Sequence, residues 1–279
     1  MKVDQLKNDM LASLSVMDSS VFDIDVFKKT GLFIVRDAIP DNKLHRWQNA
    51  WEEYANSEEG ERKEAEDNYS KVEIKTNLPD LLDGIHRDEC FVDLAEEIFG
   101  NPVGLFNKRF VVKDAFYNGE VFLHQDTCYQ CGLVEKASLF GAIFDMTPDN
   151  GGLKFYPGTH RFGYLGDAGQ IKETTLPDDW PIVAPSLRAG DIAIMNSLLW
   201  HGSPAYKAGH YRVVADFVYQ SARDYSTVEV LRGNEDIENN FLNQGDKGAG
   251  IFQRSRVSRL IELQKIVDDA LRNEQEDAE

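Results

Sequence analysis

The chain has 279 residues, and its 48 acidic and 30 basic side chains give a net charge of −18. Hydrophobic residues make up 42% of the chain, a globular composition that excludes general disorder. Nucleic-acid binding and adhesion to an anionic membrane both depend on a basic face, so we expect neither partner.

Cysteine usage and hydropathy predict a cytoplasmic location. Three cysteines are too few, and odd in number, for a disulfide framework, which favours a reducing compartment. The first 20 residues carry Asp4 and Asp9 and lack an uninterrupted apolar core, so they make a poor signal peptide. No window approaches the 18 consecutive apolar residues of a spanning helix.

Helical patterns dominate the first part of the chain. Leu44, Trp47 and Trp51 recur on one face of a segment that opens at Pro40, and Gly31 is a helix stop. The charged stretch 57–72 predicts a surface connection. We predict helices at 4–16, 21–30, 40–54 and 89–99, with a β-rich run at 32–38.

Short β-rich runs follow from about residue 104, separated by turn residues such as Asn118-Gly119 and Pro157-Gly158. Many short strands without intervening helices indicate a sandwich or closed barrel. The predicted strands are 105–113, 120–126, 137–146, 152–157, 182–185, 191–196 and 211–219. We expect a single domain over 1–279, made of helical N-terminal support (1–103), an all-β core (104–222), and a loop with a C-terminal helix (223–279, with the helix at 255–274).

His124 stands out among the six histidines because it lies two residues before Asp126 in a predicted strand. Alternating strand side chains place both on one face, where they can chelate a metal ion. His201, after the strand 191–196, is the best candidate for a third ligand. Two histidines and one carboxylate leave three positions open, the facial triad of non-haem Fe(II) oxygenases, which accepts a bidentate co-substrate and dioxygen. The alternative is a His–Asp hydrogen bond that stabilises the strand.

Arg212 follows His201 by eleven residues. If the chain turns at 205–210 and returns antiparallel, Arg212 comes back beside His201, where a buried guanidinium grips a dicarboxylate. Ser203 adds a hydroxyl to the same carboxylate. The alternative for Arg212 is a surface arginine that pairs with one of the many acids.

Three ordered segments resemble the phytanoyl-CoA dioxygenase-like family. They are 108–126 with the His-x-Asp strand, 138–160 with Asn-Gly-Gly-Leu and Pro-Gly-Thr-His, and 189–212 with Gly-Asp, the distal histidine, Gly-Ser and the arginine. The resemblance covers roughly residues 20–222 and is specific for the family, not for one member.

The resemblance implies a mainly β fold, a double-stranded β-helix (jelly-roll, cupin-like) with flanking α-helices. It also implies an Fe(II)- and 2-oxoglutarate-dependent dioxygenase that releases succinate and CO2. His124, Asp126 and His201 correspond to the iron ligands, and Arg212 with Ser203 to the clamp for 2-oxoglutarate. Related halogenases lack the carboxylate, so Asp126 favours hydroxylation. Ring formation, desaturation and demethylation stay open.

Other residues compete for a role. Cys128 and Cys131 form a C-x-x-C beside the motif, which a zinc site would use, although packing is the favoured interpretation. His160 is interpreted as a turn hydrogen-bond partner. Trp200, Asn196 and Asp216 alternate toward the predicted pocket but are interpreted as packing or support.

The leading hypothesis is therefore a cytoplasmic Fe(II)/2-oxoglutarate-dependent hydroxylase of a small molecule. The acidic balance favours a cationic or zwitterionic substrate such as a natural product. One alternative is a non-catalytic jelly-roll that binds metal or ligand as a sensor or scaffold. The other is a zinc-dependent cupin-like enzyme. The oligomeric state is not predicted.

Overall fold

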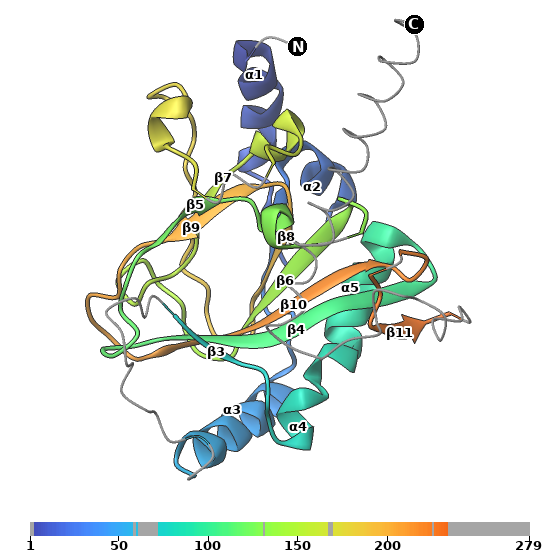
Figure 1. Ribbon diagram of the computed structural model, residues 1–279, viewed down its shortest axis with the longest axis vertical. Helices are drawn as coiled ribbons and strands as arrows, with labels where there is room; N and C mark the ends of the chain where they lie inside the picture. Colours follow the sequence, from blue (N-terminus) through green and yellow to red (C-terminus); the bar gives the residue numbers. More distant parts are fainter. Residues whose placement is uncertain are drawn as a thin grey trace, which may run out of the picture.

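The computed structural model describes residues 3–57, 60, 72–130, 132–166, 170–224 and 226–233. Strand pairing divides its strands into a major and a minor sheet (Figure 1). The major sheet runs in the order β1 (Asp18–Ser19), β2 (Leu32–Val35), β8 (Ile192–Asn196), β6 (Lys136–Ala142), β10 (Arg212–Ser221), β4 (Val103–Lys113) and β11 (Glu229–Arg232), with β3 (Glu73–Lys75) also on β4. The minor sheet is β5 (Val121–His124), β9 (Trp200–Ser203) and β7 (Lys154–Tyr156).

Helices α3 (Asp41–Ala55) and α5 (Glu89–Phe99) cover the outer face of β4 and β10 (Figure 1). The ring of Trp51 stacks on Phe110 at 5.5 Å between centroids, and Phe91 meets Phe217 edge-on at 5.0 Å. Burying such a side chain stabilises the fold by about 1.5–3 kcal/mol. Because helices occupy the outer face, the inner faces of β4 and β10 remain available for a cavity.

The remaining helices are α1 (Val3–Leu14), α2 (Ile24–Thr30) and α4 (Asp80–Asp83). The carboxylate of Asp23 accepts hydrogen bonds from the first turn of α2, and Gly31 ends that helix at φ 72°, as the sequence predicts. Leu6 and Met10 of α1 pack with Trp200 in a second apolar cluster. The predicted helices at 4–16, 21–30, 40–54 and 89–99 are all confirmed within three residues at each end.

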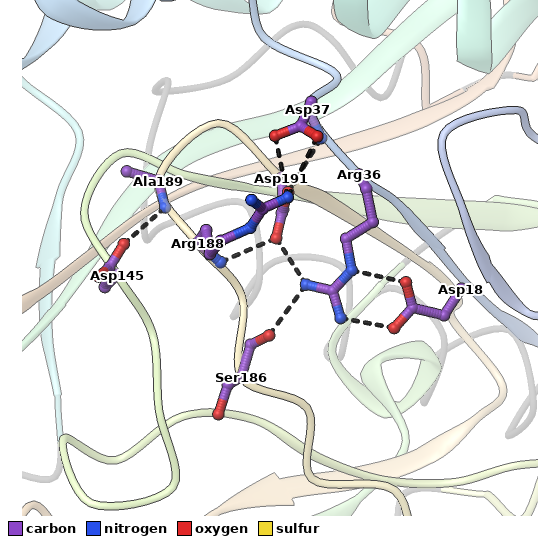
Figure 2. Close-up of polar contacts among 8 residues, drawn as sticks. All are labelled: Asp18, Arg36, Asp37, Asp145, Ser186, Arg188, Ala189 and Asp191. Atoms are coloured by element: carbon purple, nitrogen blue, oxygen red, sulfur yellow. Dashed lines mark hydrogen bonds and ion pairs between the residues drawn. The ribbon is translucent and has the colours of Figure 1, made fainter.

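The Gly190-Asp191 pair joins the N-terminal segment to the start of β8 (Figure 2). Asp191 is fully buried, and its carboxylate accepts hydrogen bonds from the backbone nitrogens of Asp37 at 3.0 Å and Arg188 at 2.8 Å. The Arg36 guanidinium donates to Asp191 at 2.6 Å and also pairs with Asp18. One buried carboxylate thus joins two segments distant in sequence, 36–37 and 188–191, and Arg36 extends the contact to Asp18.

Several elements differ from the predictions. Strand β9, which contains His201, is not among the predicted strands. The predicted strand 182–185 contributes only an isolated bridge between Val183 and Phe155. Strands β2 and β11 join the major sheet although they lie outside 104–222, because β2 pairs with β8 and β11 with β4. The predicted helix at 255–274 lies outside the described residues.

A candidate metal centre and an adjacent anion pocket

Three metal-ligating side chains converge where β5 meets β9. His124 and His201 are direct antiparallel partners, and their ring centroids lie 4.3 Å apart. The Nε2 atoms of both rings lie 3.5 Å from Oδ1 of Asp126. One ligand atom from each residue falls within 4.8 Å of the others, and all three residues are buried. This is the arrangement that the sequence predicts for one metal ion.

The position of Asp126 differs from its prediction in one respect. Strand β5 ends at His124, and Asp126 opens the 3-10 helix η2 (Asp126–Tyr129) instead of continuing the strand. The intervening Gln125 donates its amide to the carbonyls of Gly163 at 2.9 Å and Leu198 at 2.7 Å, which fixes the chain at this turn. Asp126 therefore reaches the histidines by a turn of the backbone, and not by strand alternation.

Hydrogen bonds orient all three ligands for a metal. The Nδ1 atoms of His124 and His201 lie 2.7 and 3.0 Å from the carbonyls of Phe122 and Leu199. A carbonyl only accepts, so each Nδ1 donates its proton, and Nε2 is the ring atom that faces Asp126 and is available to a metal. Ser138 donates to Oδ2 of Asp126 at 3.2 Å, on the oxygen other than the one that faces the imidazoles. The donor set fits a divalent metal that prefers nitrogen and oxygen ligands.

Electrostatics couples the protonation of the three groups. Burial opposes a charge on His201, but Asp126 outweighs it and raises the pKa of His201, so a metal ion would displace a proton there. Burial lowers the pKa of His124, and a positive charge on His201 would lower it further. Burial opposes ionisation of Asp126, but the two histidines outweigh it and hold the pKa of Asp126 well below its usual range. Asp126 is therefore anionic at neutral pH, and His124 is neutral.

A cationic pair lies further along the same site. Arg212 and Lys113 are register partners on β10 and β4, and both are buried. Arg212 donates to the carbonyl of Gly151 at 2.7 Å, while its buried Nε has no partner. The Lys113 ammonium donates to Oγ of Ser203 at 2.7 Å. Burial lowers the pKa of Arg212 to about 10, because no anion in the site compensates its charge fully.

Gly151 allows this close packing. Its φ of 78° lies in the left-handed region, and a Cβ there would come within 2.5 Å of the Lys113 side chain. Lys113 was missed by sequence reasoning, because a lysine at the end of an apolar strand usually marks the surface. Strand parity with Arg109 and Val111 is the one signal that points it inward.

The connection from His201 to Arg212 is not the predicted hairpin. Strand β9 belongs to the minor sheet and β10 to the major sheet, so the segment between them crosses from one sheet to the other. Arg212 pairs with Lys113 and reaches the site across the cavity. Arg212 and His201 line the same cavity because the inner faces of the two sheets lie opposite each other, and not because a hairpin joins them.

The three candidate ligands, Ser203 and Arg212 line one cavity of about 240 Å³. Much of the remaining wall is apolar, formed by Val72, Ile74, Val111, Val121, Phe122, Phe140, Leu153 and Val214. The cavity is also lined by Tyr129, Gly202, Arg109 and Asp216. Metal ligands at one point and a buried guanidinium at another leave space between them for a small dicarboxylate.

Among the competing residues that the structure describes, Asp216 alone lines this cavity. Cys128 is buried, and its thiol donates to the carbonyl of Gln125 at 2.8 Å, while Cys131 lies outside the described residues. His160 Nε2 lies 3.1 Å from the carbonyl of Lys28, and burial lowers the pKa of His160 to about 4. Trp200 and Asn196 are not lining residues, whereas Asp216 is. Within the described ranges, the one His/Cys/Asp/Glu cluster that fits a metal is His124, Asp126 and His201.

A two-sheet β-sandwich with a two-histidine, one-carboxylate centre defines the class of mononuclear non-haem metal enzymes. The model of the phytanoyl-CoA dioxygenase (PhyH) family matches residues 27–214, and the chain belongs to this family. A search of curated proteins finds no significant match. Nowhere in the described part of the chain is a helix both long and apolar enough to cross a membrane.

Solved structures confirm the jelly-roll fold. EctD from S. alaskensis, with 2-oxoglutarate and 5-hydroxyectoine, is 22% identical, has a TM-score of 0.63, and the match covers 84% of this chain and 87% of that chain. The epimerase SnoN from nogalamycin biosynthesis, in complex with Fe3+, alpha ketoglutarate and nogalamycin RO, is 17% identical, with a TM-score of 0.62 and coverage of 80% and 86%. Iron and 2-oxoglutarate are thus the cofactors of this fold family that the triad and Arg212 fit.

Proposed function

We propose that this protein is an Fe(II)- and 2-oxoglutarate-dependent dioxygenase that hydroxylates a small molecule. The observation that carries the proposal is the shared cavity, with His124, Asp126 and His201 at one point of its wall and Arg212 at another. A metal site alone would serve many functions. A metal site beside a buried guanidinium suits a bidentate co-substrate with a second anionic end.

The spacing of residues along β9 also supports 2-oxoglutarate as the co-substrate. Ser203 follows His201 by two residues on β9, a distance of about 7 Å along the strand. A five-carbon dicarboxylate has a similar span. Its keto-acid end would face the metal ligands, and its far carboxylate would accept hydrogen bonds from Arg212 and Ser203. Lys113 positions Ser203 through its bond to Oγ and adds positive charge.

The apolar walls have two effects in such a reaction. They exclude water, which strengthens the charge-assisted bonds to 2-oxoglutarate. They also hold the substrate beside the metal site, so that the reacting carbon is oriented before oxidation begins. Bound iron with dioxygen supplies the oxidising chemistry, and oxidation of 2-oxoglutarate releases succinate and CO2.

The outcome of oxidation is the finer part of the proposal. Hydroxylation is supported by Asp126, which would supply the third protein ligand to a bound metal ion. Among the structural neighbours are an epimerase and a carbocyclase, so the fold alone does not determine the product. A cytoplasmic location and a natural-product substrate stay predictions from the sequence.

The decisive experiment is an anaerobic reconstitution followed by exposure to oxygen. Protein with Fe(II) and 2-oxoglutarate should form succinate, and the His201→Ala variant should not. A protein that binds Fe(II) and 2-oxoglutarate but forms no succinate with any small molecule would support the sensor or scaffold alternative. Zinc retained after purification without added metal, and lost in Cys128→Ser, would support the zinc enzyme.

A further inference from the structure

The floor of the cavity is a ladder of paired side chains on β10 and β4. Register pairs Arg212 with Lys113, Val214 with Val111, and Asp216 with Arg109. Residues at alternate positions share one face, so these three pairs form successive inward rungs. The first and third rungs are four residues apart on each strand, about 13 Å. Two polar rungs are therefore separated by one apolar rung.

The first rung belongs to the proposed 2-oxoglutarate pocket, which leaves the third without a function. Asp216 interacts electrostatically with Asp126 and His201, so this rung lies on the metal side of the cavity. Neither Asp216 nor Arg109 belongs to the candidate metal cluster. If 2-oxoglutarate extends from Arg212 to the metal, the third rung faces the space that the substrate must occupy.

Asp216 carries an unsatisfied acceptor. The residue is 1% exposed, and its Oδ2 accepts a hydrogen bond from Nε of Arg109 at 2.6 Å. Its Oδ1 is buried without a hydrogen-bond partner. An unpaired buried polar atom costs about 1–3 kcal/mol, which a ligand donor would recover. Burial raises the pKa of Asp216, and Arg109 partly offsets this effect.

The charge of Asp216 is already balanced by Arg109, so its free oxygen needs a hydrogen-bond donor and not a second cation. The wall beside this rung is apolar or aromatic, with Val111, Phe140 and Val214 as its neighbours on the ladder and adjacent strand. A polar anchor in such a wall suits a mainly apolar ligand with one donor group.

We propose that Asp216 Oδ1 anchors the substrate by accepting a hydrogen bond from a neutral hydroxyl group, so the substrate class is a mainly apolar alcohol. This inference rests on the proposed function, because it takes the other end of the cavity for 2-oxoglutarate. It replaces the cationic or zwitterionic substrate expected from overall charge with one defined by the cavity itself.

The test uses three probes of similar size: cyclohexanol, cyclohexyl methyl ether and cyclohexylammonium. Dissociation constants are measured by ligand-observed NMR on protein loaded with Zn(II) and 2-oxoglutarate, which cannot turn over. A hydrogen bond to a charged group is worth about 1.5–3 kcal/mol, so cyclohexanol should bind about 10- to 100-fold more tightly than the ether. Equal affinities, or a preference for the ammonium, would overturn the proposal.

The Arg109→Met/Asp216→Leu double variant removes both charges and keeps the volume, a change that buried ion pairs often tolerate. It should abolish the preference for the alcohol and leave ether affinity within about threefold. Val214→Ala, on the apolar rung, is the matched control and should weaken both probes alike. A preference that survives the double variant would contradict the inference.

A second variant covers the case in which the double variant does not fold. In Asp216→Asn the amide oxygen can accept from Arg109, which turns the amide nitrogen toward the cavity. The preference for the alcohol should then disappear, because the amide nitrogen can donate to the oxygen of either probe. An unchanged preference would contradict the inference. Zn(II) and 2-oxoglutarate binding are measured by calorimetry on the same samples. Their absence would refute the proposed function, while probe binding to the unloaded protein would still test Asp216.

Discussion

At the scale of single residues, the metal ligands depend on groups that orient them. The imidazoles of His124 and His201 each donate Nδ1–H to a carbonyl two residues earlier on the chain. Both ligands therefore present Nε2 without any rearrangement of the strands. The sequence could predict the triad because the spacing of its motif is the same whether a strand or a turn joins the ligands. It could not show that Asp126 leaves the strand, since a turn and a strand both fit His-x-Asp.

Replacing a metal ligand should remove metal binding without unfolding the protein. We expect Asp126→Asn to weaken Fe(II) or Mn(II) binding at least 10- to 100-fold, because the amide lacks the charge that attracts the cation. His210→Ala, an exposed histidine outside the cavity, is the control and should bind metal normally. Metal titration of the purified variants measures the effect. Equal affinities for the two variants would rule out the assigned centre.

Removing the guanidinium of Arg212 should weaken the binding of 2-oxoglutarate and leave metal binding unchanged. Loss of charge-assisted bonds worth about 1.5–3 kcal/mol each predicts a rise in KM for 2-oxoglutarate of at least 10-fold in Arg212→Met. Lys113→Met should give a smaller rise, because Lys113 acts through Ser203. Arg188→Met, which loses only an exposed pair with Asp37, serves as control. Metal affinity must stay unchanged, and a KM within twofold of wild type would contradict the clamp.

At the scale of elements, the hydrophobic pattern of the sequence predicted most strands but not which strands pair with each other. Strands β4, β6, β8 and β10 were predicted because apolar runs between turn residues are typical of buried strands. The register that sets Lys113 beside Arg212 and Arg109 beside Asp216 depends on pairing across more than 90 residues of sequence. No local pattern contains that information. For the same reason, β9 was missed, since its four residues gain their strand conformation from β5 and β7.

Strand β11 is tied to the turn before α5 by one carboxylate with an unusual pKa. Glu229 accepts hydrogen bonds from His86 at 3.0 Å and from Nη2 of Arg87 at 3.1 Å. Burial favours the protonated acid, but these partners outweigh it and lower the pKa of Glu229 to about 2. A depressed folded pKa stabilises the fold above the unfolded value, and this contribution is lost as the pH falls from about 4.5 toward 2.

Glu229→Gln should therefore make the free energy of unfolding depend less on pH under acidic conditions. After allowance for solvent screening, we expect a loss of about 1–2 kcal/mol at pH 7 and a smaller difference from wild type as the pH falls below about 4. Urea unfolding between pH 7 and pH 3 measures both values. Glu53→Gln, at an exposed position on α3, is the control. A constant difference between Glu229→Gln and wild type across this range would refute the assigned linkage.

At the scale of the whole molecule, the sandwich joins segments that the sequence treats separately. The sequence predicted a β core from 104 to 222 with helical support before it. Strand β2, within the supposed support, completes the major sheet by pairing with β8. The run 32–38 was predicted to be β-rich, but its pairing with β8 was not, because a contact across more than 150 residues of sequence leaves no local pattern. The family motif Gly-Asp marks the junction, and the buried carboxylate of Asp191 explains its residue types.

Loss of that junction should destabilise the whole fold and spare the site. Asp191→Ala leaves Arg36 and two backbone nitrogens without their shared acceptor (Figure 2), a loss of about 3–5 kcal/mol. In a chain of this size the melting temperature should fall by about 6–15 °C.

Asp37→Asn is the matched control, because Asp37 is largely exposed and asparagine tolerates its φ of 51°. Its melting temperature should change by no more than about 3 °C, since exposed pairs contribute little. Metal titration well below the transition should give wild-type affinity in both variants, because Asp191 is not a lining residue of the cavity. Equal melting temperatures for the two variants would show that the junction does not stabilise the contact between the N-terminal segment and β8.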